Sequence, residues 1–391
     1  MSKIVFFCIP AHGHTNPTLP VVKELVELGH EVYYYSFNEF KEKLEEAGAH
    51  FISCDDLDLG MEETDDATDR VGKDIVFSTE LIVKSTLAFD EFAIEEMKKL
   101  NPDVIVGDSV AYWGKLTAMK LGIPFVSSTT TFAFNQYSSR IMKQSLGDLF
   151  KMLFQMPKTK KILKPLRDKG YPAENILSIV QNDNDTNTVV YTSPEFQPCS
   201  DTFSDKYSFV GPCIREAKEV LEKMRDKRVY ISLGTVNNAM ADFYQNCVKA
   251  FMDSDYEVIM SVGNNTDIES LGELPEHIRV FHSVDQIGVL QQADVFLSHC
   301  GMNSANESLY HSVPLVMFPQ TQEQGGVAFR IAELEAGIHL EKNDSACIRS
   351  SIDAVLADEK YRQNAATIAE SFRKSGGAKV AAQAILKAIE K

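Results

Sequence analysis

Long apolar runs are missing from this chain of 391 residues. A transmembrane helix needs about 18 or more consecutive apolar residues, and no segment approaches that length. The first apolar segment, Ile4 to Ile9, follows no basic region and is ended by Pro10, so it is too short for a secretory signal. We therefore expect no membrane span and no export signal, and we predict a cytoplasmic protein.

Paired cysteines and positive charge are also scarce. The seven cysteines are scattered and none forms a C-x-x-C pair, so neither a zinc site nor a disulfide framework is indicated, and their odd number fits a reducing compartment. The formal net charge of −17 disfavours nucleic acid as a partner, because an acidic surface repels phosphate backbones. With 44% hydrophobic and 24% charged residues, the chain can fill a sizeable core, so a disordered protein is not expected.

What the sequence has instead is a series of short apolar runs that are rich in Val, Ile, Phe and Tyr and barely alternate. Strands of this kind are buried on both faces, as in a parallel sheet. Helical patterns lie between them, such as Leu19–Leu28 and Ala111–Leu121. The predicted strands are Lys3–Pro10, Glu31–Phe37, Val104–Gly107, Phe125–Ser128, Val229–Leu233, Glu257–Val262, Arg279–Phe281, Val295–Ser298 and Leu315–Phe318.

The length and the repeated alternation indicate two α/β domains of roughly 200 residues each. We predict a Rossmann-like domain over residues 1–211, a linker over 212–227, a second Rossmann-like domain over 228–375 and a helix over 376–391 that could return to the first domain. The linker includes the charge-dense segment Lys218–Lys227, which is typical of a solvated linker or a surface helix. We expect the two sheets to face each other across a cleft at the carboxyl ends of their strands, where ligands of such folds bind.

The most informative motif begins where a predicted strand ends, with a tight turn at Gly301 and a helix from about Asn303. Such a helix start presents free backbone amides and a positive dipole end, which suit a diphosphate, and His299 could donate a further hydrogen bond. The pattern Ser304-x-x-Glu307 also fits a capping box that merely starts a helix. The residues by themselves leave both interpretations open.

A second predicted strand delivers polar side chains to the same edge of the sheet. It ends at Pro319, and Gln320, Glu323 and Gln324 follow it. Every sugar hydroxyl both donates and accepts a hydrogen bond, so clustered amides and carboxylates bind it well. These residues therefore predict a sugar site beside the diphosphate site.

The run from His299 to Gln324 resembles the donor signature of UDP-glycosyltransferases of the GT-B fold. It is most similar to the bacterial macrolide glycosyltransferases of glycosyltransferase family 1, and the resemblance covers nearly the whole chain. Two positions depart from the family's pattern. Ser312 stands where the family usually has Gly, and Ser283–Gln286 stands where it often has Trp or a Pro-Gln pair.

The resemblance implies a set of donor-binding residues. The nucleotide sugar is a co-substrate, and the family implies no cofactor and no metal ion. At the diphosphate, the implied residues are His299, Gly301 and Ser304, with Asn303 in the same turn and with Gly234 and Thr235 in the loop that faces the phosphates. For the nucleoside, they are Val284 and Gln286 along the base and Glu307 at the ribose. For the sugar, they are Gln320, Glu323 and Gln324.

The loop after the first strand carries the residues implied for catalysis. It lacks G-x-G-x-x-G, so a nicotinamide site is not indicated, and it resembles the family's Gly-His-x-x-Pro loop. The resemblance implies His14 as the general base, a task that a histidine pKa of about 6.5 suits, and Asp108 as the carboxylate that orients it. Asp108 would also fit an ordinary N-cap of a helix from Val110. His12 is interpreted as structural, and two histidines without a third ligand do not indicate a metal site.

A stretch rich in Met and Phe follows the fourth predicted strand. Phe132, Phe134 and Met142 from this stretch predict a plastic pocket for an aromatic or polyketide-like acceptor. Some apolar side chains of this stretch could instead face the hydrophobic core from ordinary amphipathic helices. Between Arg140 and Lys169, nine Lys or Arg stand against two Asp, so contact with an anionic membrane stays open as an alternative.

Together these features predict an inverting glycosyltransferase. It would move a hexose, expected to be glucose, from a UDP-sugar to a hydroxyl of a small hydrophobic acceptor such as a flavonoid or a macrolide. Three alternatives remain: a peripheral-membrane lipid glucosyltransferase, a nucleotide-sugar epimerase with the same two-lobed fold, and a two-lobed protein that binds a small ligand without catalysis.

Overall fold

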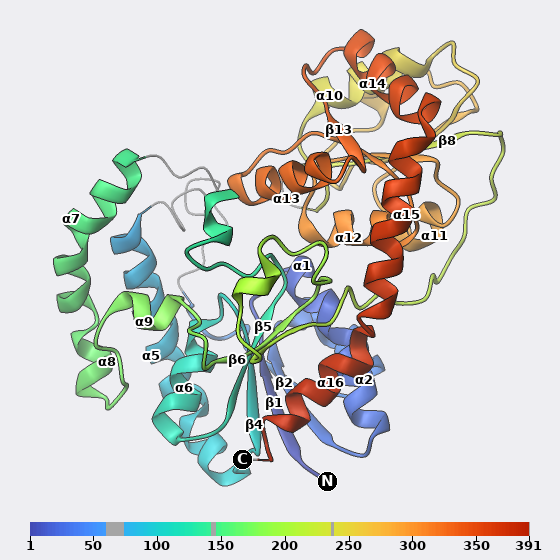
Figure 1. The fold of residues 1–391 in the computed structure, drawn as a ribbon. Helices are drawn as coiled ribbons and strands as arrows, with labels where there is room; N and C mark the ends of the chain where they lie inside the picture. The colour runs from blue at the N-terminus through green and yellow to red at the C-terminus, as the bar shows by residue number, and fades with distance from the viewer. Residues whose placement is uncertain (60–73, 142–145, 236–237, 391) are drawn as a thin grey trace. The chain divides into compact units, whose positions relative to one another are not determined.

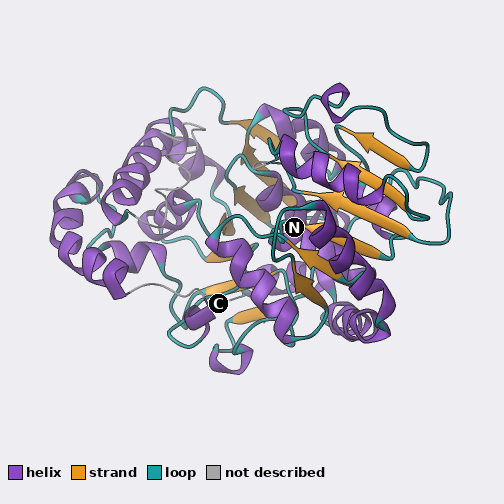
Figure 2. Cartoon of the chain, turned by 90° about the horizontal axis from the view of Figure 1, so that it is seen from above, coloured by secondary structure: helices purple, strands orange, loops and turns teal. Residues whose placement is uncertain are grey.

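The chain divides into two compact units in the computed structural model, which describes residues 1–59, 74–141, 146–235 and 238–390. The first unit comprises residues 1–191, 199–213 and 376–391, and the second comprises 192–198 and 214–375. Each unit is built on one parallel sheet, whose strands are orange in Figure 2. The domain boundaries of the sequence analysis stay predictions beside this division.

The strands of the first unit are β1 (Lys3–Phe7), β2 (Glu31–Ser36), β3 (His50–Ser53), β4 (Val104–Asp108), β5 (Phe125–Thr129), β6 (Asn187–Val190) and β7 (Tyr207–Phe209). Its α-helices in the described residues are α1 (His12–Thr15), α2 (Leu19–Glu27), α3 (Lys41–Glu46), α5 (Ile75–Leu100), α6 (Tyr112–Leu121), α7 (Leu146–Ile162), α8 (Lys164–Asp168), α9 (Ile176–Val180) and α16 (Gly377–Lys387).

The sheet of the first unit has the order β3-β2-β1-β4-β5-β6-β7, and helices cover both of its faces (Figure 1). Side chains of β1 alternate between two cores. Ile4 and Phe6 pack in the core that includes residues of α2 and α16, whereas Val5 and Phe7 pack in the core that includes residues of α5 and α6. This alternation follows from the period of two along a strand, and it explains why residues 4–7 are all apolar.

The strands of the second unit are β8 (Arg228–Ser232), β9 (Glu257–Ser261), β10 (Ile278–Phe281), β11 (Val295–Ser298), β12 (Leu315–Met317) and β13 (Gly337–His339), in the order β10-β9-β8-β11-β12-β13. Its helices are α10 (Ala241–Phe251), α11 (Gln286–Leu290), α12 (Met302–Tyr310), α13 (Gln322–Glu333), α14 (Ser345–Ala357) and α15 (Glu359–Lys374). The strand order reverses direction between β8 and β11, as it does between β1 and β4 in the first unit.

The predicted class, two parallel α/β domains of Rossmann-like topology, is confirmed. The nine predicted strands correspond to β1, β2, β4, β5, β8, β9, β10, β11 and β12, with ends that differ by at most three residues. The return of the C-terminal helix is also confirmed, because α16 packs on α2 and Gly377 N donates to Val210 O at 2.7 Å. Within the described ranges, no helix combines the length and apolarity that a bilayer span requires.

Among the described residues, four strands were not predicted from the sequence: β3, β6, β7 and β13. Three of them are edge strands, which are partly solvated and therefore need no continuous apolar run. The fourth, β6, begins with Asn187 and Thr188, and so its apolar part is only two residues long.

The charged segment before β8 forms no helix between residues 214 and 227, so the surface-helix interpretation is wrong. Arg228 and Glu257 are fully buried, and Arg228 Nε donates to Glu257 Oε2 at 2.9 Å. The Arg228 guanidinium also donates to Leu221 O at 2.9 Å and to Glu222 O at 2.7 Å, and Arg279 forms a second ion pair with Glu257. The end of the segment is thus tied to the second sheet by a buried ionic network.

Replacing Glu257 by Gln should destabilise the second unit strongly. Burial disfavours the ionised carboxylate, but hydrogen bonds from Arg228 and from Met224 N, with the charges of Arg228 and Arg279, outweigh burial and hold the pKa of Glu257 below its ordinary value. Glu257→Gln leaves the Arg228 charge buried without its partner, which costs about 3–5 kcal/mol of unfolding free energy.

Chemical denaturation measures this loss. The control is Glu276→Gln in the same unit, where the side chain is exposed and the change should stay within about 0.5 kcal/mol. Equal effects of the two substitutions would contradict the assignment of Glu257 as the centre of the network.

Candidate active site

Three strand ends in the first unit bring a histidine, an aspartate and a threonine together. β1, β4 and β5 are neighbours in the sheet; His14 lies in α1 after β1, Asp108 ends β4, and Thr130 directly follows β5. His14 Nδ1 lies 2.7 Å from Asp108 Oδ2 and 3.1 Å from Thr130 Oγ1. The Asp108 side chain is only 2% exposed. His14 and Asp108 were predicted from the sequence, whereas Thr130 was not, because a threonine beside an apolar run carries no signal of its own.

Asp108 decides which ring nitrogen of His14 is basic. Its Oδ1 accepts from Val110 N at 3.0 Å, and α6 begins at Tyr112 with Ala111 as the N-cap, so Asp108 binds the turn before α6 and is not the cap of that helix. An ionised carboxylate can only accept, so its contact with Nδ1 requires the proton there. Nε2 is then the nitrogen that can take up a proton.

The other titratable groups around Asp108 are neutral at physiological pH. Burial first, and the charge of Asp108 second, raise the pKa of the Cys8 thiol and raise the pKa of Tyr112 to about 12. Burial also raises the pKa of Tyr191 well above its ordinary value. Cys8, Tyr112 and Tyr191 therefore add no negative charge beside Asp108 at physiological pH.

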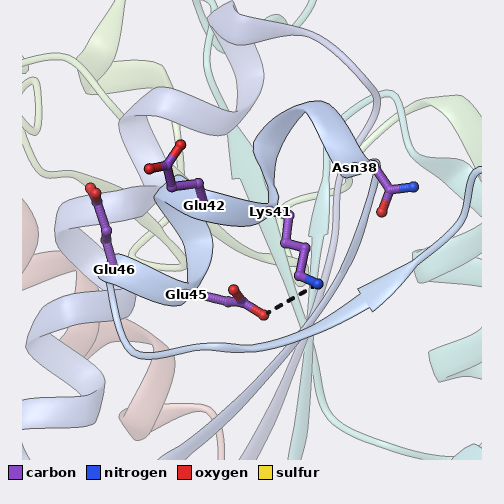
Figure 3. A pocket seen from close by; sticks show the side chains of 5 residues that line it. All are labelled: Asn38, Lys41, Glu42, Glu45 and Glu46. Atoms are coloured by element: carbon purple, nitrogen blue, oxygen red, sulfur yellow. Dashed lines mark ion pairs between the residues drawn. The ribbon is translucent and has the colours of Figure 1, made fainter.

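His12 belongs to a different surface of the first unit. Its Nε2 lies 2.8 Å from Glu39 Oε1, and its ring meets Phe40 edge-on with the centroids 5.0 Å apart. The neighbouring surface has a hollow that contains a Lys41–Glu45 ion pair (Figure 3). The residues lining this hollow are Asn38, Lys41, Glu42, Glu45 and Glu46, none of which is a predicted site residue.

In the second unit, the turn after β11 holds His299 against two glycines. A Cβ atom at Gly234 or at Gly301 would lie 2.6 Å from an atom of the imidazole, which is closer than real Cβ contacts. Gly234 also has a φ of +79°, which side chains disfavour. Burial lowers the pKa of His299 to about 4, so the ring is neutral at physiological pH. Its Nδ1 is buried and lacks a hydrogen-bond partner in the part of the chain that the structure describes, which suits an atom that contacts a ligand.

Four polar side chains of β8, α11 and α12 form one hydrogen-bonded cluster. Tyr230 Oη donates to Gln286 Oε1 at 3.1 Å, and Gln286 Nε2 donates to Glu307 Oε2 at 2.6 Å and to Ser304 Oγ at 3.3 Å. Burial raises the pKa of Glu307 to about 6, against the lowering effect of the Gln286 hydrogen bond and the Arg215 charge. A half-buried carboxylate whose pKa is raised toward neutrality is a candidate ligand-binding group.

The capping box considered for Ser304 and Glu307 is wrong. α12 begins at Met302 with Gly301 as its N-cap, and neither side chain lies where it could cap the helix. Both side chains instead belong to the cluster around Gln286. The Ser-x-x-Glu spacing alone could not reveal this, because it does not locate the first turn of the helix.

A capping box does occur at the start of α13, and it involves a predicted sugar ligand. Gln324 Oε1 accepts from Gln320 N at 2.8 Å and from Thr321 N at 3.3 Å, while Thr321 Oγ1 accepts from Gln324 N at 3.3 Å. The carbonyl oxygen of Gln324 is thereby engaged with the backbone. Gln320 Nε2 is buried and has no hydrogen-bond partner among the described residues, and Glu323 lies in the first turn of α13.

The remaining predicted donor residues lie at the same edge of the second sheet. Thr235 follows β8 and is exposed, Val284 is half-buried just before α11, and Asn303 lies in the first turn of α12. The predicted donor residues thus come from one sheet edge, although their roles remain proposals.

Known proteins match this chain over almost its full length. A family model described as "Erythromycin biosynthesis protein CIII-like, C-terminal domain" matches residues 245–385. The NDP-glycosyltransferase YjiC of Bacillus subtilis (strain 168) is 34% identical over 393 residues, covering 96% of this chain and 95% of the relative. The chain belongs to the GT-B macrolide glycosyltransferase family. It is thus a glycosyltransferase that uses a nucleotide sugar.

Two further similarities agree with this assignment. The "Uncharacterized UDP-glucosyltransferase YdhE" of Bacillus subtilis (strain 168) is 31% identical over 382 residues, covering 95% of each chain. The crystal structure of the "Glycotransferase of kitacinnamycin" has a TM-score of 0.85 and 24% sequence identity, covering 99% of this glycosyltransferase and 98% of that chain. The latter similarity supports the fold.

The predicted acceptor residues of the glycosyltransferase lie after β5. Phe132 is buried and Phe134 is partly exposed, whereas Met142 falls outside the described residues. Phe132 lies two positions after Thr130, the residue that contacts His14. Among the residues that the structure describes, no three His, Cys, Asp or Glu side chains cluster as a metal site would require.

Replacing Gly301 by Ala should move the His299 ring and raise its pKa. The new methyl group would overlap Nε2, and the ring end of a side chain yields more easily than backbone. Once displaced toward water, the imidazole loses the burial that lowers its pKa, so the value should rise from about 4 toward its ordinary value of 6.5.

An NMR titration of the histidine ring resonances measures this shift. In the native protein, His299 should stay neutral down to about pH 5, one unit above its pKa of about 4. The control is Gly325→Ala, where an added Cβ meets no atom within 4 Å. An unchanged His299 titration in Gly301→Ala would show that the turn absorbs the methyl group in another way.

Proposed function

We propose that this protein is an inverting glycosyltransferase that moves glucose from UDP-glucose to a hydroxyl group of a small hydrophobic acceptor, with His14 as the general base. The observation that carries the proposal is the 2.7 Å contact between His14 Nδ1 and the buried Asp108 carboxylate. Family membership favours transfer over the epimerase and the non-catalytic binding protein.

The His14–Asp108 pair supplies the base and its orientation. Asp108 holds the ring with its proton on Nδ1, so Nε2 accepts the proton of the acceptor hydroxyl. As that proton leaves, the developing imidazolium is stabilised by the carboxylate 2.7 Å away and by Thr130 Oγ1 at 3.1 Å. The acceptor oxygen forms a bond to the anomeric carbon, the bond from that carbon to the diphosphate oxygen breaks, and UDP leaves with the electron pair. One displacement on an α-linked donor gives a β-linked product.

The second unit supplies the groups suited to the donor. The neutral His299 ring and the backbone amides around Gly301 and Ser304 would bind the diphosphate, with Asn303 in the same turn and Gly234 and Thr235 in the neighbouring loop. Ionised Glu307 would accept from the ribose hydroxyls. The roles proposed for the rest are base contacts for Val284 and Gln286 and sugar contacts for Gln320, Glu323 and Gln324.

The acceptor is proposed to be an aromatic or polyketide-like molecule, bound in part by Phe132, Phe134 and Met142. The choice of UDP and of glucose is supported by the relative YdhE, which is named as a UDP-glucosyltransferase. The clustered amides and carboxylate after β12 add a chemical argument, because they suit a fully hydroxylated sugar better than a deoxysugar.

Substitution of His14 by Ala should abolish transfer while leaving UDP affinity nearly unchanged. The general base contributes about 10²–10⁴-fold to the rate, and the residues proposed for UDP are all in the second unit. Asp108→Asn should lower kcat by a similar factor, because an amide can donate to Nδ1 and favour the wrong tautomer. The measurements are kcat with UDP-glucose and a phenolic acceptor, and the UDP dissociation constant by calorimetry.

The matched control for this test is His12→Ala. His12 lies two residues away but contacts Glu39 and Phe40, so its removal should change kcat by less than about threefold. If His14→Ala weakens UDP binding as much as it slows transfer, the assignment of His14 as the base is wrong.

Substitution of Glu307 by Gln should weaken UDP binding and remove the part of its pH dependence that Glu307 contributes. The pKa of Glu307 is raised to about 6 by burial, so protonation below pH 6 removes the charged acceptor, and native UDP affinity should fall as the pH is lowered from 7 to 5. The variant has no such group, so its affinity should be low and should keep only the pH dependence of the UDP phosphate, whose last pKa is about 6. Calorimetric titrations at several pH values test this, and a variant with native affinity at pH 7 would contradict the ribose assignment.

A second candidate function, transfer to a lipid at a membrane surface, is favoured by one observation. Phe154 is 84% exposed on α7, and the following segment carries six Lys or Arg against one Asp between residues 154 and 169. Such a surface suits anionic lipid. Cosedimentation with anionic vesicles, together with transfer to diacylglycerol and to no soluble acceptor, would replace the small-molecule proposal with this one.

A further inference from the structure

Asp285 connects the polar cluster around Glu307 with the segment that begins the second unit. It directly precedes Gln286 and is the N-cap residue of α11, yet within the described chain its side chain makes no capping hydrogen bond to that helix. Its carboxylate accepts instead from Lys218 N and from Glu219 N at 3.0 Å, and it forms an ion pair with Arg215. We call this set of contacts the Asp285 clasp.

The backbone of the same segment also packs directly against α11. A Cβ atom at Gly288 would lie 1.7 Å from Glu219 O, so only a residue without a side chain fits there. Two backbones in contact leave little freedom to move one without the other. Within the same unit, α11 is also held by the hydrogen bonds of Gln286 with Tyr230 and Glu307.

The charges of the clasp act on the same cluster. Burial disfavours the charged form of Asp285, but the Arg215 ion pair and the amides of Glu219 and Lys218 outweigh it and hold the pKa of Asp285 below its ordinary value. The positive charge of Arg215 favours ionised Glu307, and the negative charge of Asp285 opposes it. Loss of the clasp therefore changes both the position of α11 and the field at Glu307.

We propose that Asp285 is a positioning residue for donor binding, because the clasp holds Gln286 where its amide reaches Glu307. The inference rests on the proposed nucleotide site. If the clasp opens, the 2.6 Å hydrogen bond from Gln286 Nε2 to Glu307 Oε2 is lost. Because this hydrogen bond favours the charged form of the Glu307 carboxylate, its loss favours protonation. A protonated Glu307 accepts fewer hydrogen bonds, so ribose binding weakens. The position of residues 215–219, which lie near the start of the long segment 214–375 of the second unit, then sets donor affinity.

Asp294 provides a matched control for Asp285. Both side chains are 10% exposed, and both anchor the same segment, since Asp294 Oδ2 accepts from Lys223 Nζ at 2.7 Å and from Arg228 N at 2.8 Å. Asp294 precedes β11 and makes none of the clasp contacts. Asp294→Asn should therefore loosen the segment without displacing Gln286.

The first measurement is the UDP dissociation constant and the full kinetics of each variant. Asp285→Asn should raise the UDP dissociation constant and the donor KM about tenfold, equivalent to about 1.4 kcal/mol, with kcat and acceptor KM within about twofold of native. Asp294→Asn should leave both donor constants within about twofold. Arg215→Met should resemble Asp285→Asn, and Arg215→Lys, which keeps the charge, should recover most of the affinity.

The second measurement is amide hydrogen exchange over residues 286–290 in the absence of ligand. Asp285→Asn should accelerate exchange in α11, and Asp294→Asn should not. Equal effects of the two variants on donor constants, or native exchange and native affinity in Asp285→Asn, would overturn the proposal. If the native protein binds no nucleoside diphosphate, the proposed function fails, and the hydrogen exchange still decides whether the clasp holds α11.

Discussion

Parallel strand pairing determines where both candidate sites lie, because all strands of a parallel sheet end at the same edge and are followed by loops there. His14, Asp108 and Thr130 are far apart in sequence, yet they meet because β1, β4 and β5 are neighbours. In the second unit, β8, β11 and β12 are neighbours in the same way, and the segments that follow them carry Gly234, His299 and Gln320. Side chains within the strands pack in the hydrophobic cores. The candidate functional side chains therefore lie on the first residues after the strands.

The repeated strand and helix pattern could be predicted from the sequence. Residues whose role depends on one contact with a distant part of the chain could not. Buried strands such as Val295–Ser298 are visible as apolar runs, and the resemblance located the turn at His299. Edge strands such as Tyr207–Phe209 gave no such run. Thr130 and Asp285 were missed for another reason: their importance comes from contacts with residues more than 60 positions away, and no local pattern records those contacts. The Ser304-x-x-Glu307 spacing suggested a capping box that does not exist, because α12 begins at Met302, before Ser304.

Burial gives the polar groups at these sites their chemical character. Removal from water keeps the His299 ring uncharged and brings Glu307 close to titration at neutral pH, whereas the buried Glu257 stays ionised because arginines surround it. The same cost of desolvation thus has opposite outcomes, and the deciding factor is the number of charged or hydrogen-bonding partners. Groups with few partners are the ones suited to a ligand, which supplies the missing contacts when it binds.

The placement of α16 determines the order in which the protein can be completed during synthesis. Ala381, Ala382 and Ile385 belong to the core of the first unit, together with Val21 and Leu25 of α2, although they are translated after every residue of the second unit. During translation, part of the apolar face of the first sheet therefore stays exposed to water until the second unit has been synthesised. The unit that begins the chain is the last to be finished. During that interval it is exposed to chaperones and to unwanted association, and a fragment ending near residue 213 would stay in that condition permanently.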